Sequence, residues 1–175
     1  MALCEKILIT GFSGSGKSTL MRGLKSGYGS DWEHLDDLDQ LILKNHFGFQ
    51  SIQHLVEEKG WSTFRLWERQ ELDSWLKEGG SGVLAMGGGA LNPMLFDLLK
   101  NNRKIKFCYL ETSFEECWRR LNLDSGEVRP LVKQGKENLF KIYQERSIVF
   151  NQITWKIPST NPQEVLETFL KDCRR

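Results

Sequence analysis

The sequence predicts an α/β fold of three layers, in which helices cover both faces of a central parallel sheet. Short apolar runs such as KILIT (6–10), GVLAM (82–86) and KIKFCYL (104–110) alternate with amphipathic stretches along the whole chain. Alternation of this kind builds a parallel sheet with helices on its faces. Two of the runs lead into glycine-rich segments, GFSGSGK (11–17) and GGG (87–89). Ligands bind at the carboxyl ends of strands in such sheets, so these segments are candidate binding sites.

Two strands and three helices are expected in the first half of the chain. The strands are 6–10 and a short run that ends near Leu35, and the helices are about 17–25, 51–58 and 62–78. In the last helix, apolar residues such as Phe64, Trp67 and Leu72 recur at near-helical spacing, and two glycines at 79 and 80 end the pattern.

The second half continues the alternation. Strands are expected at 82–86, 104–110 and 153–157, and helices after Asn92-Pro93, at 113–121, at about 136–150 and after Asn161-Pro162. An asparagine cap followed by a first-turn proline predicts two of these helix starts, and the capping box formed by Ser113 and Glu116 predicts a third. The segment at about 123–136 has glycines, a proline and no clear period, so we expect a mobile loop there.

Length and charge limit the class of protein. The 175 residues suit a single domain, 1–175, and a formal net charge of +1 does not favour a nucleic-acid coat or a polybasic membrane anchor. No apolar run approaches the ~20 residues of a membrane span, and Glu5 and Lys6 stand where a signal peptide needs its apolar core. The four cysteines show no metal-binding spacing. We expect a soluble, cytoplasmic protein without nucleic-acid or membrane partners.

The segment GFSGSGKST, residues 11–19, matches the phosphate-binding pattern G-x-x-x-x-G-K-[ST] between a strand and a helix. Its glycines allow backbone N–H groups to wrap around phosphates, and the following helix presents its positive end to them. Lys17 would reach the β- and γ-phosphates, and the hydroxyl of Ser18 would reach Mg²⁺. A Gly/Ser turn with a solvated lysine is the alternative. The predicted nucleotide-binding residues here are Gly14, Ser15, Gly16, Lys17, Ser18 and Thr19.

Three further features bear on the acceptor of the phosphate. Asp37 and Asp39 are two residues apart, so one could face a metal and the other a hydroxyl; a carboxylate pair that favours a helix start is the alternative. Three scattered arginines, Arg65, Arg129 and Arg146, could bind anions, although each alone is more often a solvated surface residue. The triplet Gly87–Gly89 either forms a tight turn or clears side chains from something that lies against the backbone.

These motifs together resemble the shikimate kinase family. The matching pieces stand in family order: GFSGSGKST, D-L-D (37–39), FRLWE (64–68), GGGA (87–90), VRPL (128–131) and RSIVF (146–150). The phosphate loop alone occurs in many proteins, whereas the combination is specific. The resemblance implies a P-loop kinase fold with a lid at about 123–136 and an acceptor-binding segment at about 37–68. It also implies ATP-dependent phosphorylation of the 3-hydroxyl of shikimate by a monomer that uses Mg²⁺.

The resemblance also implies residue roles. Lys17, Asp39 and Arg129 would be catalytic, with Asp39 at the reacting hydroxyl and Arg129 on the lid. Ser18 and Asp37 would hold the metal. The substrate would contact Asp39, Arg65, Gly87, Gly88, Gly89 and Arg146, with Glu68 supporting Arg65. Arg120 would lie near the adenine, with the segment 159–162, which includes Asn161, as a wall.

Two residues depart from the family pattern. Trp61 stands where the family usually has an acidic residue, and Phe150 stands where it usually has a tyrosine. Both changes touch the packing around the acceptor pocket. The alternatives are a kinase for another small molecule, such as gluconate or a nucleoside monophosphate, and a nucleotide-binding regulatory module without catalysis.

Overall fold

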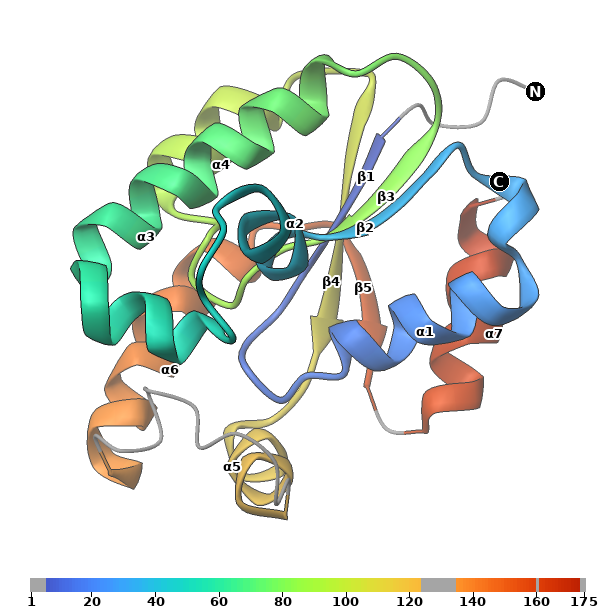
Figure 1. Ribbon diagram of the computed structural model, residues 1–175. Helices are drawn as coiled ribbons and strands as arrows, with labels where there is room; N and C mark the ends of the chain where they lie inside the picture. Colours follow the sequence, from blue (N-terminus) through green and yellow to red (C-terminus); the bar gives the residue numbers. More distant parts are fainter. Residues whose placement is uncertain (1–5, 124–134, 160, 174–175) are drawn as a thin grey trace.

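The fold is built on one sheet of five parallel strands. The computed structural model describes residues 6–123, 135–159 and 161–173. The strands are β1 (Lys6–Thr10), β2 (His34–Asp37), β3 (Gly82–Ala85), β4 (Ile105–Glu111) and β5 (Trp155–Pro158). They pair in the order β2-β3-β1-β4-β5, which places β1 at the centre (Figure 1). The loop that follows β1 therefore leaves the middle of the sheet.

Helices cover both faces of this sheet. They are α1 (Lys17–Gly27), α2 (Leu38–Asn45), α3 (Ile52–Lys77), α4 (Pro93–Leu99), α5 (Phe114–Leu123), α6 (Lys136–Phe150) and α7 (Pro162–Cys173), with a short 3-10 turn at Gly29–Asp31. Helices α1 and α7 lie on one side of the strands, and α3, α4 and α6 lie on the other (Figure 1). The predicted three-layer architecture is confirmed.

Alternating strand residues explain the two cores. Ile7 and Ile9 of β1 pack with Leu24 of α1 and Phe169 of α7, whereas Leu8 between them joins the core that contains Leu72 of α3. Successive side chains of a strand point to opposite faces, so a continuous apolar run serves a sheet that is covered on both sides. A third, smaller cluster beneath α5 and α6 includes Phe12, which anchors the loop after β1.

Most of the expected elements are present, and two differ. Strand β2 continues past Leu35 to Asp37, because Asp36 and Asp37 pair in register with Leu84 and Ala85 of β3. Helix α2 was not among the expected helices, although a helix start at the aspartates was one of two interpretations. Its start is confirmed by the Asp37 side chain, which accepts hydrogen bonds from the backbone N–H groups of Asp39 and Gln40.

The break expected between helices 51–58 and 62–78 is also present. Gly60 interrupts α3 with φ 81° and ψ 164°, a conformation that glycine adopts without a steric penalty. The acceptor-binding segment 37–68 thus consists of the end of β2, α2 and the first part of α3. The predicted lid falls largely at 124–134, and Arg129 with it, outside the described residues. Across the described part of the chain, no helix combines the length and the apolar character needed to cross a bilayer.

Candidate active site

A cleft of about 810 Å³ opens beside the carboxyl ends of the central strands. It brings together segments that are far apart in sequence: the loop after β1, the start of α2, the middle of α3, the glycine triplet after β3, α5 and α6. The predicted site residues that line it are Gly14, Gly16, Lys17, Ser18, Thr19, Asp37, Asp39, Arg65, Gly87, Gly88, Gly89, Arg120 and Arg146. The predicted nucleotide-binding residues and the predicted acceptor-binding residues therefore line the same cleft.

The loop between β1 and α1 has the backbone shape of an anion-binding turn. Gly11, Gly14 and Gly16 all have positive φ (151°, 83° and 97°), and the left-handed values at Gly14 and Gly16 would strain other residues. Lys17 folds over the loop, where its Nζ donates to the carbonyl oxygens of Gly11 (2.8 Å) and Phe12 (2.9 Å). The ammonium group is thus held at the mouth of the loop, next to the N-terminus of α1, where an anion is favoured.

Asp37 serves two purposes at once. Its Oδ1 accepts from the N–H of Asp39 at 3.0 Å and caps α2, while its Oδ2 accepts from the hydroxyl of Ser18 at 3.5 Å. The cap fixes the carboxylate and leaves one oxygen directed at the serine. A hydroxyl and a carboxylate are hard oxygen donors of the kind that Mg²⁺ takes beside substrate phosphates. The described residues contain no cluster of three or more His, Cys, Asp or Glu side chains for a metal.

Two arginines and a buried glutamate form the other half of the cleft. Arg65 Nη1 donates to Glu68 Oε2, and Arg146 lies close enough for its charge to act on both groups. Burial raises the pKa of Glu68 against the opposing effect of Arg65. Burial and the neighbouring Arg65 charge lower the pKa of Arg146 to about 10. Arg146 Nη1 and Glu68 Oε1 are buried without a hydrogen-bond partner among the described residues. Both atoms could bind a ligand, because a buried polar group costs free energy unless it is paired.

The geometry of the glycine triplet distinguishes between its two interpretations, a tight turn and the clearance of side chains. The N–H of Ala90 donates to the carbonyl of Gly87 at 3.1 Å, so a turn is present, but none of the three glycines has a positive φ. The turn itself therefore does not require glycine. A Cβ at Gly87 would lie 2.7 Å from Glu68 Oε1, and one at Gly89 would lie 2.6 Å from Arg65 Nη2 and 2.7 Å from Arg146 Nη2.

The triplet therefore keeps side chains away from the backbone so that other groups can approach it. Those groups are side chains and backbone of the same cleft. At Gly88 the nearest atoms are those of Ser13 in the loop after β1, with Oγ at 2.9 Å and the backbone nitrogen at 3.1 Å. The triplet therefore lets the acceptor arginines and the phosphate loop pack against one short segment.

Trp61 also lies in this cleft. Its ring stands 5.4 Å from the Arg65 guanidinium carbon and 5.8 Å from the ring of Phe64, and 38% of the residue is exposed. Arg65 is 5.0 Å from the Phe64 ring as well. Aromatic faces attract a cation at this range, so the departure at Trp61 supplies a contact that orients Arg65.

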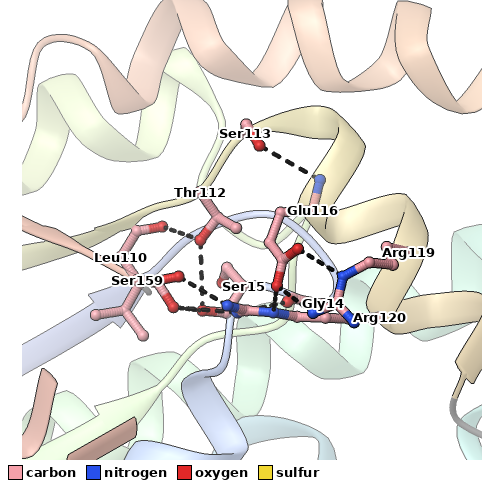
Figure 2. A network of polar contacts seen from close by, with 9 residues as sticks. All are labelled: Gly14, Ser15, Leu110, Thr112, Ser113, Glu116, Arg119, Arg120 and Ser159. Carbon is pink, nitrogen blue, oxygen red and sulfur yellow. Dashed lines mark hydrogen bonds and ion pairs between the residues drawn. The ribbon is translucent and has the colours of Figure 1, made fainter. Parts of the chain in front are cut away.

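Other predicted residues lie around the cleft in different ways. Ser15, in the loop itself, is fully buried, and Asn161 caps α7 by accepting from the N–H of Gln163 at 2.9 Å. Arg120 faces the carbonyl side of the loop and Ser159 (Figure 2). Glu116 holds Arg120, a role that sequence analysis missed because the capping box already explained the glutamate. The spacing of four residues between them on a helix was the available signal.

A phosphate-binding loop and a carboxylate–arginine pocket that share one cleft of a three-layer α/β fold define a P-loop kinase that acts on a small molecule. The family profile described as "Shikimate kinase" matches residues 13–174. This chain belongs to the shikimate kinase family. The expected fold class and enzyme class, an ATP-dependent kinase with an alcohol acceptor, are confirmed at the level of that family.

Individual relatives agree along nearly the full length. The chain is 29% identical over 173 residues to a shikimate kinase of Sulfurihydrogenibium sp., covering 98% of this chain and 99% of that protein. It is 31% identical over 167 residues to one of Streptococcus gordonii, covering 93% and 96%. The structure of shikimate kinase from Acinetobacter baumannii in complex with shikimate superposes with a TM-score of 0.76 at 25% identity, covering 96% of this chain and 94% of that one.

Proposed function

We propose that this protein transfers the γ-phosphoryl group of ATP to the 3-hydroxyl of shikimate, giving shikimate 3-phosphate and ADP in aromatic amino-acid (chorismate) biosynthesis. The observation that carries the proposal is the convergence of Arg65 and Arg146 on Gly89, in the same cleft as Lys17. Two guanidiniums suit a planar carboxylate through paired charge-assisted hydrogen bonds. A small acceptor with a carboxylate and a hydroxyl fits this arrangement better than a nucleotide, which would require a base pocket.

The donor half supplies charge to the phosphates. Backbone N–H groups of the loop and the Lys17 ammonium would hold the β- and γ-phosphates, with Ser18 and Asp37 as ligands of Mg²⁺. A bound magnesium ion neutralises phosphate charge. Phosphoryl transfer depends mainly on positioning and on charge neutralisation, so these groups act most strongly as the phosphoryl group moves. Arg129, on the predicted lid, remains a predicted contributor.

The acceptor half supplies orientation. Arg65 and Arg146 would hold the carboxylate, which leaves the hydroxyl near Asp39, whose Oδ1 lies beside Gly87. The hydroxyl oxygen then bonds to the γ-phosphorus as the bond from that phosphorus to the bridging oxygen breaks. The proton of the hydroxyl passes to the Asp39 carboxylate, and ADP leaves. Glu68 keeps Arg65 in place.

Acceptor-dependent release of ADP tests the proposal. Purified protein with Mg-ATP should produce ADP steadily when shikimate is added, and should do so only at background rate with gluconate or a nucleoside monophosphate. Preference for either control acceptor would contradict the assignment, and binding of ATP without turnover on any acceptor would favour a regulatory module. A cytoplasmic location and a monomeric state remain predictions, and size-exclusion chromatography with light scattering tests the second.

A further inference from the structure

A chain of polar contacts joins helix α5 to the phosphate loop through the residue that follows β5 (Figure 2). It begins at Glu116, whose Oε1 accepts from Arg120 Nε at 2.7 Å and from Arg119 Nη2 at 2.7 Å. Arg119 Nε also donates to Oε2 at 2.7 Å. The backbone N–H of Glu116 donates to the capping Ser113 hydroxyl at 3.3 Å, whereas its side-chain carboxylate binds the two arginines. The helix cap and the charge pair therefore use different parts of this residue.

Arg120 carries the chain across to two other segments. Its Nη2 donates to the carbonyl of Ser159 at 2.7 Å, and its Nη1 lies 3.3 Å from the carbonyl of Gly14 and 3.2 Å from the Ser159 hydroxyl. Ser159 is 7% exposed and is itself fixed by its N–H, which donates to the Glu111 carbonyl at 2.8 Å. The guanidinium is thus held on one edge by a carboxylate and presents its other edge to the loop.

Ser159 then contacts the loop backbone directly. Its hydroxyl donates to the carbonyl of Ser15 at 2.6 Å, and the Thr112 hydroxyl approaches the same oxygen at 3.5 Å. A hydroxyl that accepts from a cation becomes a stronger donor, so the Arg120 contact reinforces this bond. In a trans peptide the carbonyl and the following N–H point in opposite directions. Because Ser159 binds the Ser15 carbonyl, the Gly16 N–H points away from Ser159, and Gly16 itself lines the cleft.

We propose that Glu116 and Ser159 are positioning residues of the nucleotide site, which act through Arg120 to orient the peptide between Ser15 and Gly16 for binding a phosphate. Both residues also line the cleft, and the proposed role acts through Arg120 and the loop backbone, not through contact with ATP. The inference rests on the proposed function only in taking the loop to be the nucleotide site, and it is independent of the acceptor. Preorganised backbone donors cost no reorganisation when the phosphate arrives, so loosening the peptide weakens nucleotide binding.

The electrostatic state of the network supports a constant role across the working pH range. Hydrogen bonds from Arg119 and then Arg120 lower the pKa of Glu116 to about 2. The carboxylate consequently stays ionised at every pH at which the protein would work, and the orientation of Arg120 does not switch with pH.

Calorimetric binding of ADP and of shikimate, each alone, tests the proposal on Ser159→Ala. This variant removes the relay hydroxyl and keeps the Ser159 carbonyl that binds Arg120. We expect the ADP Kd to rise about ten-fold, the effect of one lost hydrogen bond in a preformed site, with the shikimate Kd unchanged. An unchanged ADP Kd, or an equal rise in both Kd values, would overturn it.

Glu116→Gln tests the start of the chain, because it removes the charge and keeps the shape. It should also raise the ADP Kd, and the double variant with Ser159→Ala should show less than the sum of the two effects in free energy, since both act along one path. Additive effects would contradict a shared path.

Two controls lie at the start of helix α5, one in its cap and one in its first turn. Ser113→Ala removes the cap and should lower the melting temperature without a selective loss of ADP binding. Glu115→Gln alters an exposed ion pair with Lys136 and should leave both Kd values as they are. Because ADP binding needs no acceptor, this outcome stands apart from whether shikimate is the substrate.

Discussion

Single substitutions in the glycine triplet should affect shikimate binding and nucleotide binding separately. In Gly89→Ala the new Cβ would lie 2.6 Å from Arg65 Nη2, 2.7 Å from Arg146 Nη2 and 3.1 Å from its Cζ. These atoms are the ends of long side chains, so the arginines move and the backbone does not. Because φ at Gly89 lies outside the left-handed region, alanine adds no backbone strain. The variant should therefore fold normally with a displaced anion site.

The size of the effect follows from the distances. A comfortable contact of this kind is about 3.5 Å, so both guanidiniums must retreat by about 1 Å. Charge-assisted hydrogen bonds are formed near 2.8 Å and do not survive such a shift. Each contributes about 1.5–3 kcal/mol, so the loss of one raises the shikimate Kd by about 10- to 140-fold, and the loss of two raises it further.

The matched variant is Gly88→Ala, whose Cβ would meet Ser13 Oγ at 2.9 Å and the Ser13 backbone nitrogen at 3.1 Å. Because Ser13 belongs to the phosphate loop, this variant should weaken ADP binding, whereas Gly89→Ala should spare it. Calorimetry with each ligand and a melting curve measure both. Arg146 Nη1 would lie 3.4 Å from the Gly88 Cβ, an ordinary contact, so the two glycines differ in their closest partners. Native shikimate affinity in Gly89→Ala, or equal loss of both ligands in each variant, would refute that assignment.

Three further outcomes are expected. Lys17→Ala should lower turnover by at least ~10²-fold, the scale of a lost electrostatic stabiliser, and steady-state kinetics within a few-fold of native would exclude the loop as a catalytic phosphate site. Glu68 has a raised pKa in the folded protein, so its contribution to stability is full below the ordinary carboxyl pKa and is lost as pH rises through the raised value. As pH rises from acid to neutral, the free energy of unfolding of Glu68→Gln should therefore increase relative to that of the native protein. The shikimate affinity of this variant should fall. A stability difference between the two proteins that does not vary with pH would contradict the burial effect. Trp61→Leu removes a cation–π contact worth about 0.5–1 kcal/mol, so the KM for shikimate should rise about two- to five-fold while the KM for ATP holds, and a change confined to ATP would place the ring elsewhere.

The sequence alone determined the features that depend on neighbouring residues. The phosphate loop was predictable because its glycines, lysine and serine are contiguous and lie between a strand and a helix. The break at Gly60 and the caps at Ser113 and Asn92 were predictable for the same reason, since each concerns a few consecutive backbone groups. Family motifs added the pairing of Arg65 with Arg146, which no local pattern carries.

Only the tertiary structure decided which side chains share an environment. The extension of β2 to Asp37 follows from pairing with β3, where Asp37 stands opposite Ala85, and the contact of Asp37 with Ser18 also joins distant segments. The partners of the glycine triplet come from α3, α6 and the loop after β1. The role of Glu116 depends on contacts of Arg120 with Gly14, in the loop after β1, and with Ser159, directly after β5. Periodicity reports the burial of one segment at a time. The order β2-β3-β1-β4-β5 decides which loops meet at the edge of the sheet, and that order depends on how all the segments pack together.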